Sequence, residues 1–189
     1  MNDTKYYNPE YDFLVNELKL KKVGTSLIEM DYQQLQKFYN HYNLQDLNFG
    51  QLNNNLREIL KVIYKYKNFH SSQSEKETWF LNIKHTYELL NKIPNIDSKN
   101  ITIHFEKKIY NRRIDTAIEN ENGFFIIEYS YLKESENLKD KYEEKRKQLY
   151  LYCNNLYMKT KKYIIGAIYI ENIDETKEKT LNNLKIFLE

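Results

Sequence analysis

Apolar and polar residues alternate along several segments in the second half of the chain, which is the pattern of strands in a sheet. Ile101, Ile103 and Phe105 alternate with polar neighbours, and the run from Phe124 to Ile127 suits a buried strand. The segment Asn120-Glu121-Asn122-Gly123 has turn chemistry, because Asn and Gly tolerate positive φ. The pattern predicts a mixed sheet with strands at about 101–109, 112–119, 124–131 and 162–170.

Apolar residues recur at helical spacing elsewhere. Helices are predicted at about 75–91 and 138–158, and residues 10–67 also read as helical, with Asp31 as one N-cap. A last helix is predicted after Ile170, capped near Asp174. Its apolar residues are Leu181, Leu184, Ile186 and Leu188.

The polar stretch His70-Ser71-Ser72-Gln73-Ser74 is the clearest boundary in the chain. It divides a helical N-terminal extension or cap, residues 1–72, from an α/β core, residues 73–189. The helices of the extension are a candidate surface for a protein partner.

The amino-acid composition excludes few classes of function. The formal net charge is +2, so the overall field does not by itself indicate a nucleic-acid-binding protein. A single cysteine, Cys153, excludes an intramolecular disulfide and a CxxC metal site, and its place in an amphipathic helix predicts burial. We expect an intracellular, cytoplasmic protein with no membrane contact, because Met1-Asn2-Asp3-Thr4 has no signal-peptide pattern and no apolar run is long enough to span a bilayer.

Two carboxylates fall on the predicted central strands. Asp115 is on one strand and Glu128 is on the next, so the pairing of these strands can bring them to one point. Hard divalent cations prefer oxygen ligands held in this way. A basic run precedes Asp115 and either solvates the surface or contacts phosphate groups. It consists of Lys107, Lys108, Arg112 and Arg113.

The order of these motifs resembles the PD-(D/E)XK nuclease superfamily, in its RecB-type branch, over roughly residues 75–170. The matching residues are Asp115, then Glu128-Tyr129-Ser130, then Gln148-Leu149-Tyr150-Leu151-Tyr152. The resemblance implies a restriction-endonuclease-like core: a mixed central sheet flanked by helices. It also implies hydrolysis of phosphodiester bonds in DNA or RNA with Mg²⁺ or Mn²⁺.

The resemblance assigns roles to further residues. Asp115, Glu128 and the backbone carbonyl of Tyr129 are the implied metal ligands, and the first core helix is expected to add Glu77, with Glu88 as second choice. Glu77 is equally placed to complete a helix capping box with Ser74.

One position departs from the family pattern, because Ser130 stands where the motif has Lys. Lys141, Lys145, Gln148 and Tyr152 follow at i, i+4, i+7 and i+11, on one face of the predicted helix. Lys145 is therefore the first choice for a displaced motif lysine. Lys141 is the second choice and also a candidate for contact with nucleic acid.

The predicted catalytic set is Asp115, Glu128, Lys145, Gln148 and Tyr152. Tyr129 and Tyr131 are expected to pack on the strand face opposite Glu128 and Ser130. Ser130 leaves two other interpretations open. One is an inactive protein of the same fold that binds nucleic acid or a protein partner; the other is an interaction protein in which the two carboxylates meet by coincidence.

Overall fold

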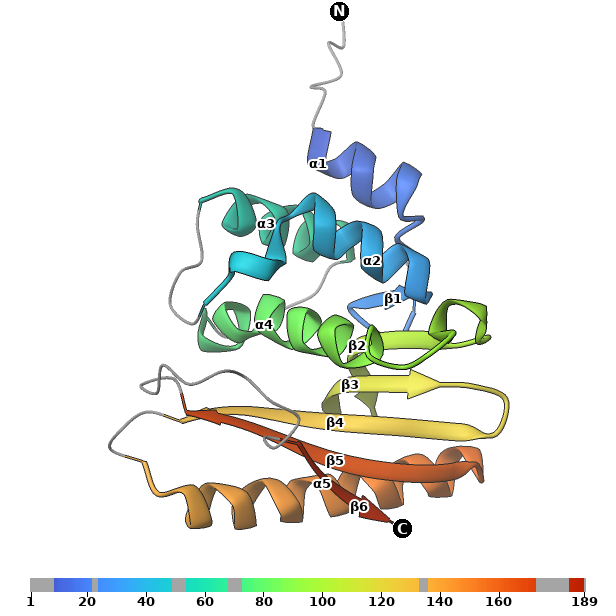
Figure 1. Ribbon diagram of the computed structural model, residues 1–189, viewed down its shortest axis with the longest axis vertical. Coiled ribbons are helices and arrows are strands. Elements are labelled where there is room, and N and C mark those ends of the chain that lie inside the picture. Colours follow the sequence, from blue (N-terminus) through green and yellow to red (C-terminus); the bar gives the residue numbers. More distant parts are fainter. Residues whose placement is uncertain are drawn as a thin grey trace, which may run out of the picture.

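A mixed sheet lies between two layers of helices in the computed structural model (Figure 1). The structure describes residues 9–21, 24–48, 54–67, 73–132, 136–172 and 184–188. For residues 55, 66–67, 73–77, 172 and 184–188 it describes the backbone alone. Helices α1 to α4 lie on one side of the sheet, where α4 and α2 contact its strands, and α5 covers the other face.

The bounds of the elements are as follows. The helices are α1 (Pro9–Asp12), which continues into the π-helical turn η1 (Phe13–Glu17), α2 (Tyr32–His41), α3 (Asn54–Lys67), α4 (Gln73–Leu90) and α5 (Leu138–Thr160). Two short 3-10 turns are η2 (Leu44–Asp46) and η3 (Ile96–Ser98). The strands are β1 (Ile28–Met30), β2 (Thr102–Ile109), β3 (Arg112–Glu119), β4 (Gly123–Leu132), β5 (Tyr163–Asn172) and β6 (Leu184–Leu188).

The strand order is β1-β2-β3-β4-β5-β6, so every strand lies beside its neighbour in sequence. All pairs are antiparallel except β4 and β5, which are parallel and are connected through α5. A parallel pair needs such a crossover, because the chain must return to the end where the first strand began. The helix places its buried residues Leu149, Cys153 and Leu156 against the sheet.

Most of the sequence predictions for the core are confirmed. The four predicted strands correspond to β2, β3, β4 and β5, and the two predicted core helices correspond to α4 and α5. The chain is an α/β protein with a mixed sheet. Asp31 caps α2 with a capping box to Gln34, and Cys153 is buried.

Two predictions of helix were wrong. Residues 28–30, within the segment read as helical, form β1 and pair with β2. Residues 184–188 form strand β6, not part of a final helix. Leu184, Ile186 and Leu188 are spaced by two residues, which is strand periodicity, and residues 173–183 lie outside the described part. The predicted division at residues 72 and 73 stays a prediction, since residues 68–72 also lie outside it.

The two faces of the β2–β3 hairpin exchange sides near its middle. Ile103 and Phe105 pack on the side of helices α1–α4. In a regular strand Ile109 would point to that same side, because it is an even number of residues away, but it packs on the α5 side. The change occurs at Glu106, whose φ of 53° is rare for a residue other than glycine. The tip of the hairpin therefore packs on α5, and Glu106 lies opposite Asp115, between the pairs Phe105↔Thr116 and Lys107↔Ile114.

The two glycines at the β4–β5 interface lead to a prediction about stability. A Cβ at Gly123 would clash with the backbone carbonyl of Tyr163, which cannot move without disturbing β5, whereas a Cβ at Gly166 would meet the side chains of Leu149 and Cys153 at 3.0 Å. We expect Gly123→Ala to lower the free energy of unfolding by about 3 kcal/mol or more and Gly166→Ala by about 1 kcal/mol. Urea denaturation of both variants tests this, and equal losses would contradict it.

Candidate functional site

The two central strands part at the two predicted carboxylates. Pairing between β3 and β4 runs from Glu119↔Phe124 to Thr116↔Ile127 and goes no further. Beyond that point β3 stays paired with β2, and β4 stays paired with β5. Asp115 and Glu128 are the first residues after the separation, one on each strand.

Each carboxylate binds the backbone of the opposite strand. The backbone N–H of Asp115 donates to Glu128 Oε1 at 3.1 Å, and the backbone N–H of Tyr129 donates to Asp115 Oδ2 at 2.9 Å. These two bonds replace ladder hydrogen bonds that the parting strands can no longer make, so neither N–H is buried without an acceptor. The same bonds hold the two carboxylates next to each other.

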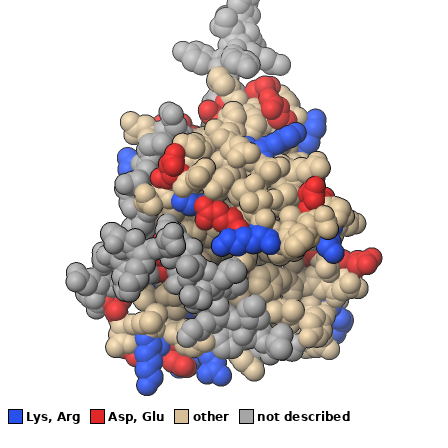
Figure 2. All heavy atoms as spheres, viewed as in Figure 1, with Lys and Arg blue, Asp and Glu red and all other residues tan. Residues whose placement is uncertain are grey.

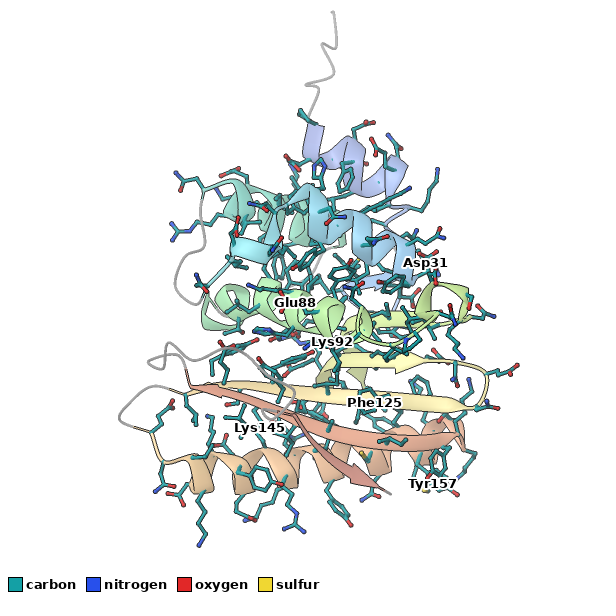
Figure 3. All side chains as sticks on the ribbon, viewed as in Figure 1. Asp31, Glu88, Lys92, Phe125, Lys145 and Tyr157 are labelled. Atoms are coloured by element: carbon teal, nitrogen blue, oxygen red, sulfur yellow. The ribbon has the colours of Figure 1, made fainter. Side chains whose placement is uncertain are left out.

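Lys145 reaches this pair from α5. Its Nζ lies 3.5 Å from Glu128 Oε2, and its side chain is only 15% exposed. Figure 3 shows Lys145 between α5 and the sheet. The position predicted for a displaced motif lysine is therefore at the carboxylates, whereas Lys141, the second choice, pairs with Glu144 on its own helix at 3.6 Å.

Burial and charge shift the pKa values of the group. Burial raises the pKa of Glu128 well above its ordinary value, and the negative charge of Asp115 adds to the rise. Burial alone would lower the pKa of Lys145, but the charges of Asp115 and Glu128 outweigh it and the pKa is raised. Lys145 is therefore a cation at neutral pH, and Glu128 holds a proton more readily than an ordinary glutamate.

Gln148 and Tyr152 complete the face of α5 that the sequence predicted. The Gln148 amide donates to Tyr152 Oη at 2.8 Å. Burial, followed by the charge of Glu128, raises the pKa of Tyr152, so its hydroxyl stays protonated near the carboxylates. Gln148 also lines an open groove beside the site. The other lining residues are Arg112, Asp140, Glu143, Glu144, Lys147 and Leu151.

The tyrosines beside the motif pack on the far side of the sheet, as expected. Tyr129 Oη is 2.6 Å from Thr86 Oγ1, and Tyr131 Oη donates to Asn82 at 2.8 Å, both on α4. Ser130 is buried on the strand face that Glu128 shares. The backbone position of Glu128 is thus fixed from α4, while its carboxylate faces α5.

The remaining predicted residues are more scattered. Glu77 lies in α4, but its side chain is outside the described part. Glu88 accepts a hydrogen bond from Tyr39 Oη at 3.0 Å, within the helical layer.

The basic run does not form one cluster. Lys107 donates to Thr25 Oγ1 at 3.2 Å, Arg113 lies 3.6 Å from Glu106, and Lys108 and Arg112 are exposed. Only Arg112 lines the groove.

Sequence reasoning missed two parts of the site: the exchange of hydrogen bonds between carboxylates and backbone, and the bend at Glu106. Glu106 adds to the rise in the pKa of Glu128, so it belongs to the same electrostatic group. No local pattern marks it, because glutamate gives no signal for positive φ. A signal was available for Asp115 and Glu128. The two residues lie equally far from the turn between β3 and β4, so they continue the register of the residues that do pair.

Comparison with family models, curated proteins and solved structures finds no match to this chain. Over the described residues, no helix is long and apolar enough to cross a membrane. No group of three or more His, Cys, Asp or Glu side chains in that part of the chain is placed to hold a metal ion. Among the described side chains, the carboxylates that the structure brings together at this site are those of Asp115 and Glu128.

The raised pKa of Glu128 gives a prediction for stability against pH. Because the folded protein binds the proton more tightly than the unfolded chain, stability is highest below the unfolded pKa, near 4.5, and falls as pH rises toward the folded value. We expect Glu128→Gln, in the absence of divalent metal, to remove this fall and to be more stable than wild type at neutral pH.

The measurement is the free energy of unfolding of both proteins at a series of pH values in EDTA. The difference between the two curves isolates Glu128 from other titrating groups, such as His104. A difference that does not change with pH, or one that favours wild type as pH rises, would contradict the prediction.

Proposed function

We propose that this chain is a divalent-metal-dependent nuclease with a PD-(D/E)XK-like core. The observation that carries the proposal is the approach of Lys145 Nζ to within 3.5 Å of Glu128, at the point where Asp115 and Glu128 bind each other's strands. An aspartate and a glutamate on neighbouring strands, with a lysine beside them, are the groups that the motif requires. Here the lysine comes from α5, and Ser130 occupies its usual place.

The donor set fits Mg²⁺ or Mn²⁺. Mg²⁺ is commonly held by one or two carboxylates with water and substrate oxygens completing the shell. Asp115 and Glu128 repel each other when both are ionised, and this is one cause of the raised pKa of Glu128. A cation held by both would remove that repulsion.

A bound Mg²⁺ or Mn²⁺ would supply an activated water and neutralise charge on the phosphate. The protein residues have separate tasks. Asp115 and Glu128 would hold the metal, with the Tyr129 carbonyl as a further proposed ligand. Lys145, kept protonated by the two carboxylates, would stabilise negative charge that develops on the phosphoryl oxygens. Gln148, which lines the groove, donates a hydrogen bond to the buried Tyr152 and would orient its hydroxyl. A phosphodiester would bind on the groove side of Gln148.

Metal binding should appear as stabilisation. We expect Mn²⁺ to raise the melting temperature of wild type, by about 2.7 kcal/mol of free energy at a concentration of 100 times Kd. Asp115→Asn and Glu128→Gln should lose this response, since each removes one charged ligand. Differential scanning fluorimetry with and without Mn²⁺ measures it, with Glu88→Gln as a matched control in the helical layer. An equal response in all four proteins would place the metal elsewhere.

Lys145 allows a test of catalysis that is separate from metal binding. We expect Lys145→Ala to abolish Mn²⁺-dependent cleavage of DNA and RNA while keeping the thermal response to Mn²⁺. Lys141→Ala is the control and should retain activity, because Lys141 pairs with Glu144. Adding Ser130→Lys to Lys145→Ala should restore part of the activity, since Ser130 shares the face of Glu128.

Full activity in Lys145→Ala would contradict the role of this lysine. A wild type with neither a Mn²⁺ response nor cleavage of single- or double-stranded DNA or RNA would favour the inactive, binding form of the fold.

A further inference from the structure

The charges of α5 are separated along the helix. Its first part carries Asp140, Glu143 and Glu144, whereas residues 145–162 contain no Asp or Glu. That stretch, which runs two residues past the end of α5, has six cations, of which Lys145, Arg146 and Lys162 pair with Glu128, Glu143 and Glu119. The other three are Lys147, Lys159 and Lys161. Among the described residues on the face drawn in Figure 2, by contrast, anionic and cationic side chains are interspersed. A negatively charged ligand would thus meet no carboxylate of α5 along this part of the helix.

The same part of α5 exposes large apolar and aromatic side chains. Tyr150 and Tyr157 are each 51% exposed, and Met158 is 63% exposed. Tyr150 and Tyr157 are seven residues apart, so they lie on one face of the helix, about 10 Å from each other. Single exposed apolar residues are ordinary, but a row of them marks a binding surface.

Lysines lie over the exposed rings. Lys161 Nζ is 5.3 Å from the centroid of Tyr157, and Lys159 Nζ is 6.0 Å from that of Tyr110, which lies at the tip of the β2–β3 hairpin and is 58% exposed. These distances allow cation–π contacts. Figure 3 shows Tyr157 near the end of α5 farther from Lys145.

This surface is continuous with the groove at the candidate site. Leu151, which lines the groove, follows Tyr150 directly in α5 and lies two helical turns before Met158. Lys147 and Arg112 line the groove together with three carboxylates at the start of α5, Asp140, Glu143 and Glu144. The exposed tyrosines therefore adjoin the groove on its Lys147 side. Lys159 lies about 180° around the helix from Tyr150, so it and Tyr110 belong to the other side of α5. We refer to Lys147, Tyr150, Tyr157 and Lys161 as the α5 surface.

We propose that the α5 surface binds a single strand of DNA or RNA and leads it to the Asp115–Glu128 site. The inference rests on the proposed nuclease function and names its substrate as unpaired nucleic acid. The bases of a single strand are free to stack on tyrosine rings, whereas the bases of a duplex are already paired and stacked on each other. The lysines beside the rings would contact the phosphates. The interleaved lysines argue against a protein partner, because lysine is depleted in the centres of protein interfaces.

The test is binding in EDTA, where a metal-dependent nuclease cannot cleave. Fluorescence anisotropy measures the affinity for labelled oligo(dT), oligo(U) and a duplex of mixed sequence. We expect wild type to bind both single strands more tightly than the duplex, and Tyr150→Ala and Tyr157→Ala each to weaken single-strand binding roughly 5-fold or more. Tyr11→Ala is the matched control, since Tyr11 is 44% exposed but lies in α1. All variants should melt at the wild-type temperature.

The salt dependence of binding tests the lysines of the α5 surface separately. Lys147→Gln and Lys161→Asn should each reduce the slope of log affinity against log salt by about 0.7, as expected for the loss of one phosphate contact to a single strand. Asn is chosen at Lys161 because that residue has a φ of 58°, which Asn tolerates. Lys92→Gln, in the turn after α4, is the control and should leave the slope unchanged. Comparison of oligo(dT) with oligo(U) distinguishes DNA from RNA.

The outcomes separate this proposal from the nuclease proposal. Tyrosine-dependent single-strand binding without Mn²⁺-dependent cleavage would support the α5 surface and overturn the nuclease. Cleavage by wild type, together with equal duplex binding or wild-type affinity in both tyrosine variants, would overturn the α5 surface alone. Self-association that is lost in Tyr150→Ala, with no binding of nucleic acid, would identify a protein interface and overturn it as well.

Discussion

The site depends on one exchange of hydrogen bonds, at the point where β3 and β4 part. A sheet that splits leaves backbone N–H groups without ladder partners, and a buried N–H without an acceptor is costly. Here the carboxylates of Glu128 and Asp115 accept hydrogen bonds from two of those N–H groups. The constraint that satisfies the backbone therefore also places two negative charges side by side. Lys145 from α5 offsets part of that charge, and the rest is what a divalent cation would neutralise.

The bend of the β2–β3 hairpin allows this split. The faces of the two strands change sides at Glu106 in β2 and at Asp115 opposite it in β3, so the apolar residues at the tip of the hairpin pack on the α5 side. The tip then forms one wall of the groove, through Arg112, and adds Tyr110 to the exposed part of α5. Strained backbone of this kind is often found at functional sites. The bend thus links the geometry around Asp115 and Glu128 to the surface that we propose for the nucleic acid.

Much of the fold could be predicted because the core strands have clear alternation and the core helices have clear periodicity. β1 was missed because three residues, Ile28–Met30, are too few to show a period, and its place in the sheet comes from pairing with β2. In the site, the spacing placed Lys141 and Lys145 on the same face of α5 as Gln148 and Tyr152, and did not choose between the two lysines. The structure separates them, because Lys145 lies 3.5 Å from Glu128 whereas Lys141 pairs with Glu144. The bend at Glu106 could not be predicted, because it arises from the packing of the hairpin on α5 and not from a local preference of glutamate.

The proposed function depends on the binding of one divalent cation by Asp115 and Glu128 together. A crystal structure with Mn²⁺, with the ion located from its anomalous scattering, tests this. We expect a peak at about 2.0–2.3 Å from a carboxylate oxygen of each residue, distances typical of a small divalent cation. We also expect Lys145 Nζ to move away from Glu128 Oε2. A crystal grown in saturating Mn²⁺ with no peak between the two carboxylates, and with Lys145 still against Glu128, would contradict the proposed binding.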